Sequence, residues 1–307
     1  EVVDRLSKET SRTTGKLFPI DLLCQVLQVA KSSYYDYLRQ QKQKAQGHRR
    51  KRPGPKVQID DPALLVAIVA VLQGSPFATE GVKKVHARLR RQGIVASRER
   101  INRLMREYGL LSPQRSEPGE PKTHEGTIIP TTINQIWGTD GTLFGTVNGD
   151  LLWLFAVIDH FSDEILGWHI VEVGQGDRFA ALEPIKQGLR KIRGAIGEGL
   201  GQGIAIRHDW GPQYIAHDFK AELKFFGLKN SPALVHEPQT NGVIERFFKT
   251  LKMECLWVEN FQDVDHAREI VGRWLELYNT QWLIERHRYR TPREVREAHQ
   301  DQLAHAG

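Results

Sequence analysis

The sequence predicts an α/β protein in which small all-α domains precede a core of strands and helices. Three observations lead to this prediction. Apolar residues recur at helical spacing up to about residue 111, and short β-rich runs begin at about residue 133. A stretch rich in Pro, Gly and Glu lies between the two, at 112–130. We therefore expect a domain boundary in that stretch.

Two helical segments make up the first part of the chain. Residues 17–46 contain FPIDLLCQVLQV followed by AKSSYYDYLRQQ, in which Ser32 and Ser33 are candidate caps of the second helix. Residues 60–111 open with Asp-Asp-Pro, which favours a helix start, and Ser97 is expected to cap a later helix of the same segment. Each segment predicts a helix-turn-helix. An ordinary small helical bundle has the same spacing and stays an alternative.

The part after the boundary predicts strands joined by helices. The runs INQIWGTDGTLFGTV, LLWLFAVIDHFS and EILGWHIVEV indicate three successive antiparallel strands. A helix is expected over about 177–192, the strand GIAIRHD ends at Asp209, and a second helix covers about 215–227. SPALVHEPQT is loop-like, and NGVIERFFKTLKMECLWV predicts one long helix. This element order is that of the ribonuclease H-like fold, a mixed five-stranded sheet with flanking helices.

The domain organisation follows from these segments. A further amphipathic helix is expected over 262–280, after the core, where it packs on the core or serves assembly. The predicted parts are an N-terminal helical segment at 1–50, a basic linker at 51–59, a second helical domain at 60–112, a linker at 113–132, the α/β core at 133–258 and a C-terminal helical extension at 259–307.

Positive charge is concentrated in the front part of the chain. The formal net charge is +6, but residues 1–130 carry 24 Lys and Arg against 13 Asp and Glu, whereas the remainder carries 19 against 24. The basic run HRRKRPGPK at 48–56 would neutralise phosphates and release counterions, which gives affinity for a polyanion without reading a sequence. A solvated linker that merely carries charge is the alternative interpretation of that run. The front part is therefore expected to bind nucleic acid.

Composition also excludes several classes of protein. No stretch of eighteen apolar residues exists, and EVVDRLSKET has no apolar signal core, so neither membrane insertion nor secretion is expected. The two cysteines, Cys24 and Cys255, lie far apart in sequence and support neither a disulfide framework nor a cysteine zinc site. A reducing cytoplasm fits this composition. Because the chain does not begin with Met, a processed, trimmed or fused product is also expected.

Three acidic residues on separate elements suggest a metal-dependent phosphodiester enzyme. Asp140 lies in WGTDGT, Asp209 in RHDWGPQY, and Glu245 follows after 35 intervening residues in PQTNGVIERFFKTLK. Two divalent ions that activate an attacking oxygen and stabilise a leaving oxygen need several converging carboxylates. Oxygen ligands favour Mg²⁺ or Mn²⁺ over zinc. Asp159 is the rival for the first position; strand order favours Asp140 and leaves Asp159 as a turn-capping or supporting group.

The motifs carry a family resemblance over nearly the whole chain. Residues 133–295 resemble the DDE integrase core of the retroviral integrase superfamily, and most closely the insertion-sequence transposases of the IS-three family. The resemblance rests on AVIDHFSDEILGW, WGTDGT, DWGPQY, NGVIERFFKTLK and YNTQWLIERHRYRTPREV. Further forward, CQVLQVAKSSYYDYLRQQ and GIVASRERINRLMREYGLLSP are similar to the family's N-terminal DNA-binding helices. The zinc-binding N-terminal module of retroviral integrases is not expected, because no paired His and Cys cluster is present.

The resemblance implies a DNA transposase. Such an enzyme hydrolyses a phosphodiester at the end of its element and then directs the freed 3′ hydroxyl to target DNA, without a covalent protein intermediate. Expected partners are double-stranded DNA of the terminal repeats and the target, further copies of the chain on that DNA, and an upstream-frame DNA-binding protein; no membrane partner is expected. A bacterial, nucleoid-associated location in the cytoplasm is implied. A non-catalytic DNA-binding regulator derived from a transposase and a stand-alone nuclease of the same fold remain alternatives.

The resemblance also assigns roles to individual residues. Asp140 and Asp209 would share two Mg²⁺ or Mn²⁺ ions, and Glu245 would complete the second site. The residues expected to contact DNA are Lys252, Lys249, Arg246, Gln239, Arg49, Arg50, Lys51, Arg52, Arg98, Arg100 and Arg103. Asn241 is expected at a helix N-cap, where its side chain can accept an amide hydrogen bond.

Two residues beside Asp209 depart from the family pattern. His208 occupies a position that is usually small and polar, and it is either a proton shuttle, a DNA contact or a structural neighbour of the acid. Trp210 replaces a common Arg, which removes a phosphate contact and offers a surface for base stacking. Neither change deletes an expected metal ligand.

Overall fold

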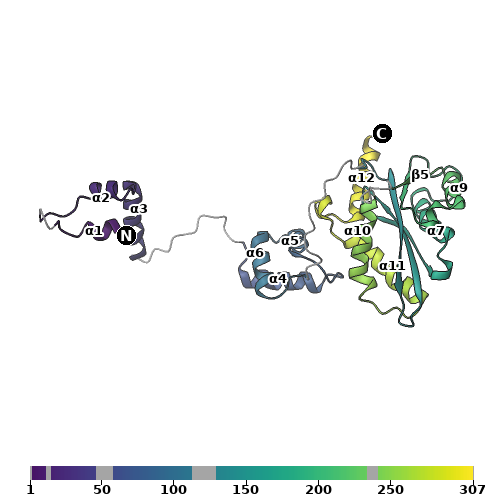
Figure 1. Cartoon of the computed structure of the whole chain (residues 1–307), viewed down its shortest axis with the longest axis horizontal. Coiled ribbons are helices and arrows are strands. Elements are labelled where there is room, and N and C mark those ends of the chain that lie inside the picture. Colours follow the sequence, from purple (N-terminus) through teal and green to yellow (C-terminus); the bar gives the residue numbers. More distant parts are fainter. Residues whose placement is uncertain (1, 12–14, 46–57, 113–128, 234–240, 307) are drawn as a thin grey trace. The chain divides into compact units, whose positions relative to one another are not determined.

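The computed structural model describes residues 2–11, 15–45, 58–112, 129–233 and 241–306. The chain forms two compact units, Glu1–Val57 and Gln58–Gly307, and each is described by itself. Figure 1 shows the helices at the start of the chain and the sheet of the second unit. Gln239 and the basic residues Arg49, Arg50, Lys51 and Arg52 lie outside the described residues.

The first unit is helical, as the sequence predicts. It contains α1 (Val2–Leu6), α2 (Ile20–Val26) and α3 (Lys31–Ala45). Its small core consists of Val3, Leu23, Cys24 and Tyr34. The predicted cap of α3 is wrong, because the helix begins at Lys31 and both Ser32 and Ser33 lie inside its first turn.

The second unit begins with three short helices that share one apolar core. They are α4 (Asp61–Gln73), α5 (Val82–Arg91) and α6 (Arg98–Glu107). The side chain of Asp60 caps α4 by accepting the amide of Ala63 at 2.9 Å, and Ser97 caps α6 by accepting the amide of Arg100 at 3.2 Å. Both starts are where the sequence predicts them. The fully buried residues of this core are Leu64, Ile68, Val85, Leu89, Ile101 and Met105.

A five-stranded mixed sheet forms the centre of the second unit. The strands are β1 (Ile136–Gly145), β2 (Leu151–Asp159), β3 (Ile165–Glu172), β4 (Ala205–His208) and β5 (Lys229–Pro232), in the spatial order β3-β2-β1-β4-β5. β1, β2 and β3 pair antiparallel, and β4 and β5 extend the sheet in parallel from β1. This is the predicted ribonuclease H-like topology.

The fifth strand corrects one local prediction. Its last residues belong to SPALVHEPQT, which the sequence suggests is a loop, yet they pair in parallel with β4. Lys229 and Asn230 are exposed and the strand lies at the sheet edge. Because an edge strand of three polar residues and a proline has no alternating apolar pattern, only its pairing reveals it.

Helices cover both faces of the sheet (Figure 1). α7 (Arg178–Arg193) and α9 (His217–Phe225) share a core with Phe155 and Val157 of β2. α10 (Gly242–Leu251) and α11 (Val264–Gln281) share the opposite core with Leu154 and Ala156 of the same strand. The alternation along β2 therefore separates the two cores. The remaining elements are η1 (Val173–Gln175), α8 (Pro212–Ile215), η3 (Lys252–Leu256), η4 (Glu285–His287) and α12 (Pro292–Ala306).

The long helix expected from NGVIERFFKTLKMECLWV is not uniform. It is α-helical to Leu251 and continues as the π-helical turn η3. Glu254 of this turn is buried, and its carboxylate accepts backbone hydrogen bonds from Ala78 at 2.8 Å and Thr79 at 3.2 Å. π-Helical turns within helices often mark functional positions. Here the turn connects the segment after α4 to the core.

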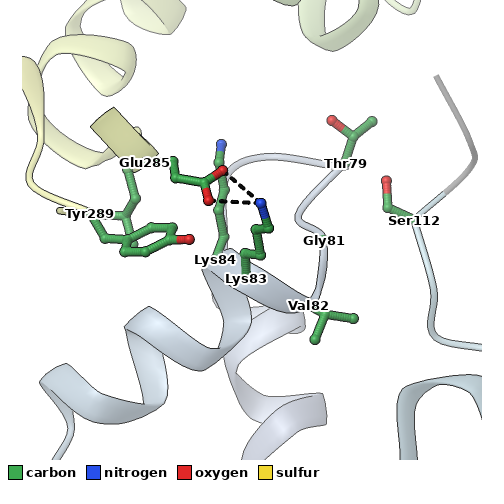
Figure 2. Close-up of a pocket in the computed structure, with 9 residues that line it drawn as sticks. Thr79, Gly81, Val82, Lys83, Lys84, Ser112, Glu285 and Tyr289 are labelled. Carbon is green, nitrogen blue, oxygen red and sulfur yellow. Dashed lines mark hydrogen bonds and ion pairs between the residues drawn. The ribbon is translucent and has the colours of Figure 1, made fainter. Parts of the chain in front are cut away.

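A cavity of about 350 Å³ lies where α5 meets the C-terminal extension (Figure 2). Lys83 at the start of α5 pairs with Glu285 at 2.7 Å, and both side chains are more than half exposed. The ammonium group of Lys84 lies over the ring of Trp282. These contacts add to the interface between the helical domain and the core.

Among the helices that the structure describes, none combines the length and the apolar character that a membrane-spanning helix needs.

Candidate active site

Asp140 and Asp209 are neighbours across two parallel strands. β1 and β4 pair Ile136 with Ala205, and this register continues through Gly138 and Arg207. Extended by two residues, the same register sets Asp140 opposite Asp209, which directly follows β4. Registered residues of adjacent strands project toward the same side of a sheet. Asp140 and Asp209 therefore lie side by side at the point where β4 ends.

The helix that carries Glu245 is fixed against the strand that carries Asp140. Asn241, at the N-terminus of α10, donates a long hydrogen bond of 3.5 Å to the carbonyl of Thr139. It makes no capping hydrogen bond, so the expected capping role of its side chain is wrong. Glu245 lies one turn further along the same helix face and is exposed. The apolar face of α10, which includes Ile244 and Phe248, is buried against the sheet.

The three acids influence one another electrostatically. The pKa of Asp140 is raised from its ordinary value to about 7, first because burial disfavours the carboxylate and then because the charges of Asp209 and Glu245 repel it. The amide of Gly141, 2.7 Å from Asp140 Oδ1, and the cation of Lys252 oppose this shift. Charges shift the pKa of a carboxyl group appreciably only when they lie near it. Asp140 is therefore the most perturbed member of a local acidic group.

The donor chemistry of this group fits a divalent cation. Carboxylate oxygens are the ligands that Mg²⁺ and Mn²⁺ prefer, and a cation would offset the repulsion that raises the pKa of Asp140. Within the described residues, no three His, Cys, Asp or Glu side chains lie close enough together to hold a metal ion. The backbone therefore aligns Asp140 with Asp209, whereas the side chains are not gathered into a coordination sphere.

His208 is held by both of its ring nitrogens beneath Asp209. Nδ1 lies 2.6 Å from the carbonyl oxygen of Asp209, to which it donates, and Nε2 lies 2.6 Å from Oδ1 of Asn230. The ring is 1% exposed and stacks on Tyr214 at 5.4 Å between centroids. Among the alternatives for His208, this geometry favours the structural neighbour of the acid.

Tyr214 is a residue near the acids that the sequence alone does not single out. Its side chain is buried, and desolvation, followed by the charge of Asp140, holds its pKa well above the ordinary value. It therefore stays neutral beside the acidic group. The signal for it is weak, because a tyrosine five residues after Asp209 also suits an ordinary core position.

Asp159 has other partners. It is fully buried and forms an ion pair of 2.5 Å with Arg296 of α12. Its two oxygens also accept the backbone amides of Asn134 at 3.0 Å and Phe161 at 2.8 Å. Burial raises the pKa of Asp159, and Arg296 opposes that shift. These contacts favour a structural role for Asp159 and leave Asp140 as the candidate ligand.

The basic residues expected to contact DNA fall into two groups. On the catalytic side, Arg246 and Lys249 are exposed on α10, and Lys252 begins η3 with its charge acting on Asp140. On α6, Arg98 is exposed. Arg100 and Arg103 instead pair with Asp61 of α4, as the next contacts show.

Asp61 joins the two arginines at the start of α4. Its Oδ1 accepts from Nε of Arg100 at 2.6 Å, and its Oδ2 from Nη2 of Arg103 at 2.5 Å. The pKa of Asp61 is lowered, chiefly by its hydrogen bonds to Arg103 and then to Arg100. Two of the three arginines expected to contact DNA from α6 therefore also hold the helical domain together.

Comparison with known proteins agrees with this fold. Residues 58–117 match the family described as HTH-like domain, and residues 227–292 match the family described as Integrase core domain. The putative transposase InsK for insertion sequence element IS150 of Escherichia coli (strain K12) is 25% identical, over 92% of this chain and 94% of that protein. The transposase InsF for insertion sequence IS3A of the same strain is 28% identical, over 86% and 89%. The chain is a homologue of the IS3-family transposases.

Two further matches are an uncharacterised relative and a solved structure of lower sequence identity. An uncharacterized 31 kDa protein of insertion element IS600 from Shigella sonnei is 27% identical over 84% of this chain and 92% of the relative. Among solved structures, the catalytic core domain of BIV integrase is 18% identical with a TM-score of 0.39, covering 56% of this chain and 99% of that chain. The transposase relatives and the integrase core domain support a DNA transposase or integrase function.

Proposed function

We propose that this chain cuts DNA at the ends of an insertion element and joins the freed 3′ ends to target DNA. Asp140, Asp209 and Glu245 are the proposed ligands of two Mg²⁺ or Mn²⁺ ions. The observation that best supports the proposal is the register of β1 and β4, which aligns Asp140 with Asp209 beside the helix that carries Glu245. The three acids come from distant parts of the chain, and this register is what supports their convergence in the proposal.

The residues of the chain supply positioning and charge for this reaction. When bound, divalent ions activate the attacking oxygen and stabilise the leaving oxygen of a phosphodiester. Asp140 and Asp209 hold fixed places because β1 and β4 are paired in the sheet. With a pKa of about 7 when no cation balances it, Asp140 exchanges its proton near neutral pH, so ion binding there is coupled to proton release. Lys252 attracts the phosphate of the DNA end.

The helical domain contributes DNA binding in this proposal. Arg98 is an exposed cation on α6, and residues 58–117 match the HTH-like domain. Contacts between this domain and DNA phosphates would position the element end without reading bases, whereas contacts to base edges would supply sequence specificity. Joining two ends to one target requires more than one active site, so a homo-oligomer on DNA is part of the proposal.

Strand-transfer assays test the proposal. Purified protein, a labelled duplex with the terminal repeats that flank the coding sequence, and Mg²⁺ should yield joined products. Glu245→Gln and Asp209→Asn should each remove these products by at least about a thousandfold while DNA binding persists. Glu259→Gln, which changes an exposed glutamate downstream of the site, should leave joining unchanged. Cleavage without joining would favour a nuclease, and tight binding without either product would favour a regulator; both results contradict the proposal.

A further inference from the structure

Trp210 is an exposed aromatic residue directly beside a proposed metal ligand. Trp210 is 52% exposed, although its indole is large and mostly apolar. It follows Asp209 in the chain, just beyond the end of β4, the strand that pairs with the strand of Asp140. An indole in this position contributes nothing to either core of the second unit. Its exposure therefore needs another explanation.

The indole is exposed but not free to turn. Nε1 of Trp210 donates a hydrogen bond of 2.8 Å to the carbonyl of Ala233, just after β5. A single exposed tryptophan without such a tether would sample several rotamers. The hydrogen bond instead fixes the ring in one orientation, and it uses the only polar atom of the side chain. What the ring presents to a ligand is therefore an apolar surface.

The turn that carries Trp210 is held on both sides. The amide of Gly211 donates to Oδ1 of Asp209 at 2.9 Å, so ring and carboxylate belong to one fixed turn. Pro212 begins α8, and Nε2 of Gln213 donates to the carbonyl of Gly176 at 3.3 Å. Ring and carboxylate thus keep a constant mutual position. Whatever approaches the acid also meets the indole.

A nucleobase is the ligand that suits this surface. Every base has a flat π face that stacks on an aromatic side chain, so such a contact is independent of sequence. Inside a duplex, both faces of a base are already covered by neighbouring base pairs. Only a base that has left the stack, or one at an unpaired end, can lie on the ring. A phosphodiester held at Asp209 would bring the adjoining base within reach of Trp210.

We propose that Trp210 stacks on an unpaired base next to the phosphodiester that is cut or joined. This inference rests on the proposed function, because it takes DNA at Asp209 as the substrate. The indole holds the displaced base and so keeps the end of the DNA open beside the acids. Trp210 is then a substrate-binding residue, and it contributes to end opening and not to the chemical step.

Fluorescence of 2-aminopurine tests the stacking directly. The probe is the terminal-repeat duplex with 2-aminopurine placed in turn at the last three positions of the transferred strand. Every measurement uses the Glu245→Gln background, so that binding is observed without cleavage. At one of these positions, binding of the protein should change the fluorescence of 2-aminopurine, because the base leaves the DNA stack and stacks on the indole. Trp210→Ala should remove the quenching by the stacked aromatic ring, and Trp210→Phe, which keeps an aromatic face, should keep part of it.

Trp257→Ala is the matched control. Trp257 is 69% exposed, and it lies twelve residues beyond Glu245, after the π-helical turn η3. Its replacement should leave the fluorescence of the probe unchanged. Fluorescence that is the same with Trp210→Ala as with Trp210, or that changes equally with Trp257→Ala, would overturn the inference. Thermal unfolding of each variant identifies any general loss of structure.

Joining assays with altered ends give a second readout. On a fully paired end, Trp210→Ala in the protein that retains Glu245 should lower joining by about tenfold, the scale of one base–aromatic contact. A mismatch at the terminal pairs opens the DNA in advance, so it should restore most of the activity. An equal defect on paired and mismatched ends contradicts the inference. If Glu245→Gln still joins DNA, the proposed function fails instead, whatever the fluorescence result.

Discussion

The carboxylate of Glu254 accepts a hydrogen bond of 2.8 Å from the backbone amide of Ala78, 176 residues away in the chain. Glu254 belongs to η3, which continues the helix of Glu245, and Ala78 precedes α5 of the helical domain. Phe77 beside it is buried in the core and packs edge-on against Trp282 at 4.8 Å between ring centroids. The helical domain and the proposed catalytic helix are therefore joined by a buried contact.

Removing this contact should destabilise the second unit. Glu254→Ala leaves the amides of Ala78 and Thr79 without their acceptor, and hydrogen bonds to a charged group are worth about 1.5 to 3 kcal/mol. We expect the free energy of unfolding in urea to fall by about 2 to 4 kcal/mol and proteolysis near residue 78 to increase. Thr79→Val, which removes one hydroxyl, should cost less. Equal stability of Glu254→Ala and the parent protein would contradict this expectation.

Breaking the buried ion pair between Asp159 and Arg296 should lower the free energy of unfolding. Arg296 is 5% exposed and pairs with both Asp159 and Glu164, so Arg296→Met leaves the buried carboxylate of Asp159 without its cation, whereas Glu164 keeps its ion pair with Lys191. We expect a loss of about 3 to 5 kcal/mol in the free energy of unfolding at pH 8. The loss should shrink at acid pH, where the carboxyl groups are protonated. Arg273→Met, at an exposed ion pair, is the control and should change stability by less than about 1 kcal/mol.

The raised pKa of Asp140 predicts a pH-dependent stability. Its pKa is about 7 in the folded protein and near 3.8 in the unfolded chain, so the folded state binds the proton more tightly. The contribution of this group is therefore most favourable below about pH 4 and is lost as the pH rises through 7. Asp140→Asn should raise stability by on the order of 1 to 3 kcal/mol at pH 8 and by little at pH 4.

Magnesium provides the complementary measurement on the same variant. Mg²⁺ should raise the melting temperature of the parent protein more at pH 8 than at pH 5, because binding requires the carboxylate form. Asp140→Asn should lose most of that response. If Mg²⁺ stabilises both proteins equally, Asp140 is not a ligand.

Gly138 should be required for the alignment of the acids. A Cβ at this position would overlap Nε2 of His160 and lie 3.2 Å from Oδ1 of Asn241. Gly138→Ala therefore displaces the ring of His160 and presses on Asn241 at the start of α10, the helix that carries Glu245. A shift of about 1 Å can lower a rate about a hundredfold, and the smaller shift expected of Asn241 should lower joining by less than that while DNA binding persists.

Gly242→Ala is the matched control for that experiment. Gly242 lies at the start of α10, and a Cβ there meets no atom within 4 Å. The substitution should leave joining unchanged and raise stability slightly, because alanine favours a helix. Joining that is normal in Gly138→Ala would show that the contact between Asn241 and β1 does not position Glu245.

Much of this molecule could be predicted from local patterns. The caps Asp60 and Ser97 and the first three strands all follow from residue type and spacing within a few residues. Such patterns suffice because a cap or an alternating strand reflects hydrogen bonding and burial that neighbouring residues already specify. β5 was missed because its sequence, Lys-Asn-Ser-Pro, carries no such signal.

The tertiary structure alone decided which distant groups meet. Parallel pairing of β1 with β4 aligns Asp140 with Asp209. Arg296, 137 residues away in the chain, forms an ion pair with Asp159. Asn241 likewise reaches β1 instead of capping its own helix. Partners far apart in the chain are selected by packing and by the cost of leaving a buried charge or amide unpaired, and neither is encoded in local spacing.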